Sequence, residues 1–107
     1  MASSLDFVQF VCEQLRDTGD ITYKKMFGEY MVYVNARPIL LICNNTVYVK
    51  MLDCIRDKMD GAEIGSPYNG AKPHYILDID NAEFSKQVVL ILETVTPIPT
   101  KRKTTKK

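Results

Sequence analysis

Between residues 30 and 50, short apolar runs alternate with turn-forming residues, a pattern typical of β-strands. Strands are predicted over residues 30–34, 39–43 and 46–50. The first is followed by a turn over residues 35–38, and the second by Asn44-Asn45, because asparagine tolerates the positive φ of a tight hairpin. The pattern therefore predicts a three-stranded antiparallel meander.

The side-chain pattern predicts which faces of these strands are covered. Residues 39–43 are apolar at every position, which favours a strand covered on both faces. In the last strand Val47 and Val49 alternate with Tyr48 and Lys50. Because successive side chains point to opposite faces, we expect the two valines on the core side and the other pair opposite.

A helix is predicted over residues 4–18, with Ser4 as its N-cap and Gly19 as its left-handed end. The apolar residues of this segment fall on one arc at helical periodicity, except Phe10. Phe10 lies on the polar side, where it is either an ordinary exposed aromatic residue or a contact for a partner.

Weaker patterns predict the remaining elements. A short strand is predicted over residues 22–25. Gly28 then interrupts the strand-like pattern and is expected to mark a bulge or a close backbone approach. A short helix is predicted over residues 52–59, a loop over 65–73 and a strand over 74–79.

The last predicted element is a helix that starts at a capping box formed by Asp80 and Glu83. Its buried face is predicted to hold the following residues: Phe84, Val88, Ile91, Leu92 and Val95. Pro97 and Pro99 then end the helix. The order of elements indicates an α+β fold, an antiparallel sheet with helices packed on one face, in one domain over residues 1–96.

Charge is unevenly distributed along the 107 residues, whose net charge is +1. Residues 97–107 form a basic tail that we expect to be disordered and that contains five basic residues, Lys101, Arg102, Lys103, Lys106 and Lys107. The preceding residues are acidic overall, whereas a folded nucleic-acid-binding surface usually belongs to a basic domain. The N-terminus lacks the pattern of a secretory signal and no apolar run would span a bilayer, so we expect a cytoplasmic protein.

Motifs of known chemistry are missing from the sequence. There is no phosphate-binding loop, dinucleotide fingerprint or nucleophile elbow. Cys12, Cys43 and Cys54 are odd in number and widely spaced, which favours free thiols over a disulfide framework or a zinc site. A reactive thiol would need a base, and His74 is the only histidine. We therefore expect neither enzymatic activity nor a metal or cofactor.

Six tyrosines are many for a chain without tryptophan. Tyrosines on a sheet face near Lys24, Lys25, Arg37 and Lys50 would be able to stack single-stranded bases. Alternatively they form cross-strand pairs and pack beneath the helices. The basic tail has two interpretations as well, since it would either contact phosphates or simply keep the chain in solution.

The run from Met26 through Phe27, Gly28 and Glu29 to Tyr33 resembles the signature of the TfoX (Sxy) N-terminal domain family. The turn at residues 35–38 and the strand at 46–50 are also similar to that family, and the resemblance covers about residues 5–95. It implies an α+β fold with a central antiparallel sheet, no cofactor and no established catalytic residues. It further implies a bacterial protein linked to transcriptional control of competence genes, through contacts with partner regulators.

Three hypotheses follow, of which the first is a regulatory domain that works by protein–protein contact or self-association. The second is direct nucleic-acid binding through the tail and a surface of Lys, Arg and Tyr side chains, and the third is an enzyme that uses one of the thiols or His74. The candidate interaction surface comprises Phe10, Lys24, Lys25, Tyr30, Arg37, Tyr48 and Lys50.

Overall fold

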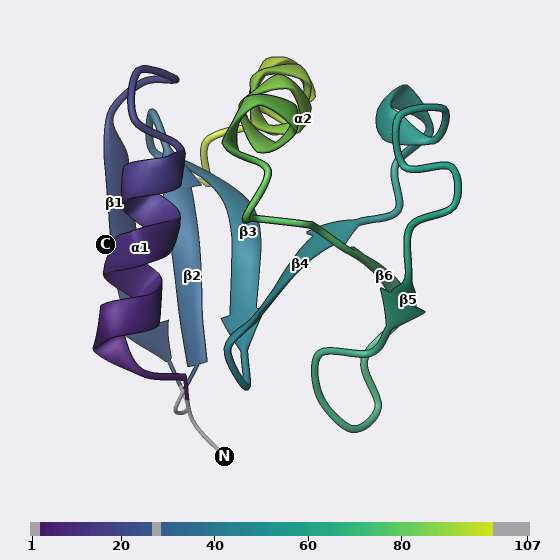
Figure 1. Cartoon of the computed structure of the whole chain (residues 1–107), viewed down its shortest axis with the longest axis horizontal. Helices are drawn as coiled ribbons and strands as arrows, with labels where there is room; N and C mark the ends of the chain where they lie inside the picture. The colour runs from purple at the N-terminus through teal and green to yellow at the C-terminus, as the bar shows by residue number, and fades with distance from the viewer. Residues whose placement is uncertain (1–2, 27–28, 100–107) are drawn as a thin grey trace, which may run out of the picture.

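The computed structural model describes residues 3–26 and 29–99, which form one antiparallel sheet with two α-helices on one of its faces (Figure 1). The α+β class and the placement of the helices are thus confirmed. In chain order the elements are α1 (Leu5–Gln14), β1 (Ile21–Met26), β2 (Glu29–Val34), β3 (Arg37–Cys43), β4 (Thr46–Lys50), the 3₁₀ turn η1 (Asp53–Ile55), β5 (Ile64–Gly65), β6 (His74–Ile76) and α2 (Ala82–Val95).

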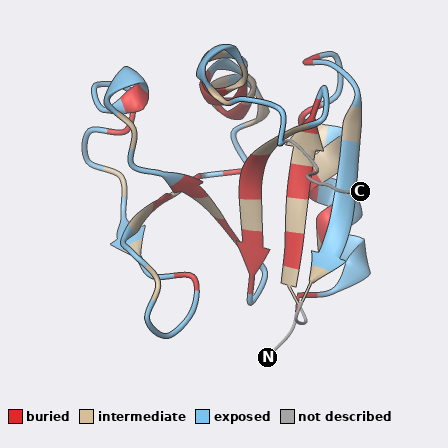
Figure 2. Cartoon of the chain, turned by 180° about the vertical axis from the view of Figure 1, so that it is seen from behind, coloured by how far each residue is buried: buried red, intermediate tan, exposed pale blue. Residues whose placement is uncertain are grey.

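The sheet has six strands in the order β1-β2-β3-β4-β6-β5, and neighbouring strands are antiparallel. The predicted meander is therefore present and gains β1 on one side. On the other side β6 pairs with β4, and the two-residue strand β5 follows it. Seen from behind, the strands lie in front of the helices, so the second face of the sheet carries neither of the described α-helices (Figure 2).

Two-residue turns connect the central strands. Asn44 and Asn45 have φ values of 52° and 55°, which confirms the predicted tight hairpin. Asn35 and Ala36 have φ values of 52° and 68°. The predicted turn over residues 35–38 was therefore too long, because Arg37 already pairs with Val34 in the ladder between β2 and β3.

Helix α1 starts as predicted, since the Ser4 hydroxyl accepts a hydrogen bond of 3.1 Å from the Phe7 amide. Its end differs from the prediction. The helix stops at Gln14, and the left-handed residue beyond it is Asp17, with a φ of 76°, rather than Gly19. The Thr18 hydroxyl donates a 2.6 Å hydrogen bond to the Leu15 carbonyl and so holds this bend.

Helix α2 is capped by Asn81, whose side-chain oxygen accepts a hydrogen bond of 3.1 Å from the Phe84 amide. The predicted capping box at Asp80 was therefore wrong by one residue. The predicted face was partly wrong as well, because Val95 is exposed whereas Ser85 is buried. The Ser85 hydroxyl donates to the carbonyl of Asp78 at 3.1 Å, which allows a polar side chain to point inward.

For the helix predicted over residues 52–59 and the strand predicted over 74–79, the buried positions agree with the prediction but the element bounds do not. The helix predicted over residues 52–59 is one 3₁₀ turn followed by turns, although Ile55 and Met59 are buried as its pattern required. Strand β6 ends at Ile76 instead of residue 79, yet the Leu77 amide still donates to the Val47 carbonyl at 2.9 Å. Leu77 and Ile79 therefore remain directed at the core.

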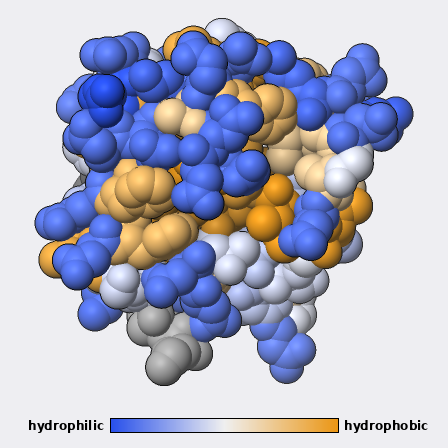
Figure 3. Space-filling view, viewed as in Figure 1, coloured by the Kyte–Doolittle hydropathy of each residue, from blue (hydrophilic) through white to orange (hydrophobic). Residues whose placement is uncertain are grey.

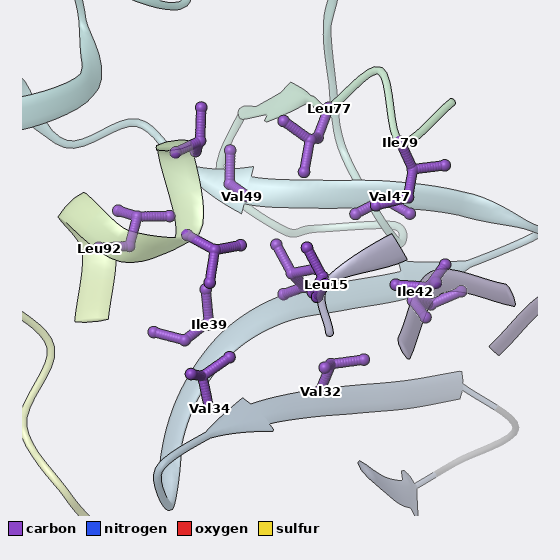
Figure 4. Packing of buried hydrophobic residues seen from close by; sticks show 14 of the residues in the cluster. Leu15, Val32, Val34, Ile39, Ile42, Val47, Val49, Leu77, Ile79 and Leu92 are labelled. Atoms are coloured by element: carbon purple, nitrogen blue, oxygen red, sulfur yellow. The ribbon is translucent and has the colours of Figure 1, made fainter. Parts of the chain in front are cut away.

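The core lies between the sheet and the two helices (Figure 4). Strands β2, β3 and β4 contribute one layer, including Val32, Ile42 and Val49. Leu92 of α2 and Leu15, which directly follows α1, are among the residues that cover it. Two predictions lie outside the described residues. They are the bulge at Gly28 and the part of the basic tail over residues 100–107.

Candidate functional site

The face of the sheet without helices carries an unexpected row of apolar side chains. Residues directly opposite each other in neighbouring strands project from the same face. The strand register places Lys24, Met31, Leu41, Tyr48 and Ile76 side by side across β1, β2, β3, β4 and β6. Apart from the exposed lysine, each of these residues is half-buried. We call this side of the sheet the open face.

A second row runs beside the first. Tyr33 lies opposite Pro38, and Lys50 lies opposite His74. The His74 ring packs edge-on against Tyr48 with 6.4 Å between ring centroids, and its Nδ1 lies 2.7 Å from the Lys72 carbonyl oxygen. His74 thus joins the open face to the segment that precedes β6.

That segment borders a groove of about 460 Å³. Its floor is formed by the open face, including Met31, Pro38, Leu41 and Tyr48, and residues 68–72 form the border. Lys50, Lys72 and His74 also line it. Hollows of this size, mostly apolar with a few polar groups, are typical of binding sites. We call it the open-face groove.

The charge around the groove has the opposite sign to the rest of the chain. The described residues include nine basic and 13 acidic side chains. Of the basic residues, Lys50 and Lys72 line the groove and Lys24 lies opposite Met31 on β1; all three are exposed. Among the acidic side chains of the strands, the register places Glu29 on the open face. The open face is therefore a basic surface on an acidic domain.

No family model matches the chain. Its sequence is 30% identical, over 105 residues, to the "Uncharacterized 12.7 kDa protein in trpE 5'region" of Spirochaeta aurantia. The alignment covers 96% of this chain and 91% of the spirochaete protein. The chain belongs to the family of this protein. Because the similarity extends over nearly the whole of both chains, it includes the sheet, both helices and the open face.

The candidate residues chosen from sequence separate into two groups in this family member. Lys24, Tyr48 and Lys50 come together on the open face. Lys25 and Tyr30 lie opposite each other on the helix side, where Tyr30 is 7% exposed and meets the ring of Tyr23 at 5.8 Å. The structure therefore does not form one continuous surface from these side chains.

Phe10 and Arg37 also lie away from the open face. Phe10 is on α1, 39% exposed, with its ring 6.3 Å from that of Phe7. The Arg37 side chain donates from Nε to Glu93 at 3.0 Å and from a terminal nitrogen to the Thr96 carbonyl at 3.3 Å. Arg37 thus ties the start of β3 to the end of α2, and its role in the structure is to hold the helix.

Met31, Leu41, Lys72 and His74 line the groove but were not predicted as part of the interaction surface. The strand pattern contained a signal for the first two, since they occupy the side of β2 and β3 opposite the buried residues Val32 and Leu40. Lys72 and His74 had no such signal, because only the pairing of β6 with β4 brings them to the open face.

The surroundings of the two thiols with shifted pKa values, Cys12 and Cys43, disfavour the nucleophilic thiolate form. Burial raises the pKa of Cys43 to about 12, with a further contribution from the neighbouring Glu29 carboxylate. Burial also raises the pKa of Cys12. A nucleophilic thiol needs the opposite shift. Cys54 is exposed. Across residues 3–26 and 29–99, no three His, Cys, Asp or Glu side chains form a group that would hold a metal ion.

The helix side has a wider and shallower depression, of about 670 Å³, between α1, the start of β4 and the N-terminus of α2. Figure 3 shows this side, with apolar atoms visible between hydrophilic ones near the middle of the view. Its rim includes Asp60, Glu63, Asp78 and Asp80, so it shares the sign of the domain. None of the described helices is both long enough and apolar enough to cross a bilayer.

Proposed function

We propose that this protein is a non-enzymatic interaction module that binds a protein partner through the open-face groove and acts in gene regulation. The observation that carries this proposal is the apolar row of Met31, Leu41, Tyr48 and Ile76, which is left half-buried with exposed lysines beside it. An antiparallel sheet with one solvated face normally carries polar residues on that face. Apolar side chains rimmed by charged ones are typical of interaction sites instead.

The arrangement favours binding over catalysis. The acid–base candidates near the groove are few, and the His74 ring nitrogen is already engaged with the Lys72 carbonyl. The buried thiols have raised pKa values. A binding surface, by contrast, requires only a complementary shape and charge, which the groove and its lysines supply.

The resemblance to the TfoX N-terminal domain family supports the regulatory setting. That resemblance implies transcriptional control of competence genes through partner regulators. A partner held on the open face would provide such a contact without any reaction at this chain. Direct nucleic-acid binding is the competing outcome, and the experiment below separates the two.

The test is affinity capture from a bacterial lysate, with and without nuclease, using the wild type and two matched variants. Leu41→Asp places a charge on the groove floor, whereas Leu90→Asp places the same charge on α2, where Leu90 is 48% exposed. We expect a nuclease-resistant protein to be retained by the wild type and by Leu90→Asp and lost with Leu41→Asp. Thermal melts of all three proteins check that they are folded.

Two results would overturn the proposal. Capture that disappears with nuclease would assign the surface to nucleic acid. Retention of the same partner by a folded Leu41→Asp variant would move the contact away from the open face. Met31→Asp is a second groove variant, on the neighbouring strand, and keeps the test decisive if Leu41→Asp fails to fold.

A further inference from the structure

We infer that the partner enters the open-face groove as an extended acidic segment, with apolar side chains on the groove floor and carboxylates paired with Lys24, Lys50 and Lys72. This inference rests on the proposed function, because it concerns the same surface. It adds the chemical class of the partner, which the proposed function leaves open.

The charge distribution is the first argument. Two exposed lysines line the groove and a third, Lys24, lies beside its floor on β1, while the described part of the chain as a whole has more acidic than basic residues. A partner with a basic surface would be attracted to the other sides of the domain, and an acidic partner is attracted to this one. Complementary charge therefore orients an acidic segment over the open face.

The spacing of the lysines is the second argument. Lys24 is on β1 and Lys50 is on β4, three strand positions away and two residues beyond Tyr48. At about 4.8 Å between strands and about 3.3 Å per residue, the two backbone positions are roughly 16 Å apart. An extended segment covers this distance in about five residues. Two acidic residues separated in this way, with apolar residues between them, would match the lysines and the row between them.

The nature of the groove floor is the third argument. Its strand residues are mainly aliphatic, including Met31, Pro38 and Leu41, and the aromatic ones are Tyr48 and His74, which pack edge-on against each other. Proteins that bind single strands stack successive bases on several aromatic rings. Tyr30, which sequence placed in such a platform, is buried on the helix side. The floor thus suits aliphatic and aromatic side chains of a peptide better than bases.

The volume of the groove is consistent with a segment of chain. About 460 Å³ accommodates a few side chains, and residues 68–72 border it on one side. Tyr68 in this border is 55% exposed and is available to cover an occupant. A peptide lying across the strands meets the floor on one side and Tyr68 on the other.

The experiment is an NMR titration of the ¹⁵N-labelled full chain, which reports each backbone amide separately. The probes are a short peptide with two glutamates about five positions apart and leucine and phenylalanine between them, the same peptide with both glutamates replaced by lysines, and oligo(dT). We expect the acidic peptide alone to shift amides of β2, β3, β4 and residues 68–74. Added salt should weaken its binding.

The matched variants reverse the charge of two lysines at a time. Lys50→Glu combined with Lys72→Glu should weaken binding of the acidic peptide at least tenfold. Lys58→Glu combined with Lys86→Glu changes net charge equally, away from the groove, and should change affinity by less than twofold. An acidic peptide that shifts no amides, or equal losses in both double variants, would overturn the inference. Shifts of the same amides by oligo(dT) instead of the peptide would overturn it in favour of nucleic acid.

The same variants separate this inference from the proposed function. In the capture experiment, a partner lost with Leu41→Asp but kept by Lys50→Glu/Lys72→Glu would leave the interaction module in place and refute the acidic segment. A partner kept by all folded variants would refute both. A partner lost with the groove variants and kept by the two controls would support both.

Discussion

Replacing Gly19 by alanine should destabilise the domain far more than its exposed position suggests. A Cβ atom on Gly19 would lie 2.6 Å from Nδ2, 2.8 Å from Oδ1 and 2.9 Å from Cγ of Asn35. The Gly19 φ of +147° is also a conformation that alanine rarely adopts. Asn35 in turn accepts a 2.9 Å hydrogen bond from the Asp20 amide through Oδ1. The substitution therefore strains the backbone and displaces a side chain that joins two loops.

The expected cost has two parts. Backbone strain at a positive φ costs of order 1–3 kcal/mol. Moving the Asn35 side chain away also removes its hydrogen bond, a loss of about 1 kcal/mol. Together they give a decrease of about 2–4 kcal/mol in the free energy of unfolding for Gly19→Ala. Gly61 is the matched control, because its φ is +86° and nothing lies within 4 Å of an added Cβ. Gly61→Ala should therefore show the strain alone.

Urea unfolding followed by circular dichroism measures these differences, and a double-mutant cycle with Asn35→Gly identifies their cause. Glycine suits the φ of 52° at position 35, so this variant loses the side chain without new strain. Because the side chain that the added methyl group would meet is then gone, the double variant should be more stable than additivity predicts by about 1 kcal/mol. Additive costs, or equal effects of Gly19→Ala and Gly61→Ala, would refute the steric argument.

Three further predictions concern the helix caps, the ion pair and the buried thiol. Asn81→Ala should cost about 1 kcal/mol and Asp80→Ala less than about 0.5 kcal/mol, as measured by urea unfolding; equal costs would contradict the cap assignment. Arg37→Met and Glu93→Gln should each lower the melting temperature, with non-additive effects in the double variant, because Arg37 and Glu93 pair at 3.0 Å with only 29% and 24% of their side chains exposed; additive effects would show that the pair is not coupled. The pKa of Cys43 is raised to about 12 from an ordinary value of 9.0, so the folded state keeps its proton longer than the unfolded state. The contribution of this thiol to the free energy of unfolding is therefore complete below pH 9.0 and is lost as pH rises toward 12, by at most about 1.4 kcal/mol per pH unit. In urea unfolding across that range, the free energy of unfolding of Cys43→Val should fall less steeply with pH than that of the wild type. Equal slopes for the two proteins would contradict the pKa shift.

Local patterns were sufficient to predict the meander. The alternation in residues 46–50 placed Val47 and Val49 in the core, and the Asn44-Asn45 pair marked its hairpin, because both signals depend on neighbours in sequence. Residues 39–43 were harder. Their uniform apolarity predicted cover on both faces, yet Leu41 is only half-buried on the open face.

Features that depend on distant residues were not predictable from these patterns. The register between β2 and β3 shifts between Val32 and Tyr33, which changes the side on which the first residues of β3, Arg37 and Pro38, project. The pairing of β6 with β4 joins residues 48–50 and 74–76, and this alone brings His74 to the groove. From sequence, Arg37 is expected to be a surface cation. Its pairing with Glu93 depends on where α2 packs against the sheet, which the local pattern does not show. The structure therefore places Lys24, Tyr48 and Lys50 on one face of the sheet and the other candidate residues elsewhere.

The two ends of the sheet have a consequence for the behaviour of the protein at high concentration. Strand β1 has a neighbour in the described structure on one side only, so its outer backbone groups form a template on which another chain would be able to pair. Lys24 and Lys25 are consecutive on this strand and so place one positive charge on each face. Two copies approaching through β1 would bring these charges together. At the opposite end, β5 is only two residues long. The domain can therefore keep an apolar open face and still resist strand-to-strand aggregation, because repulsion protects one edge and shortness protects the other.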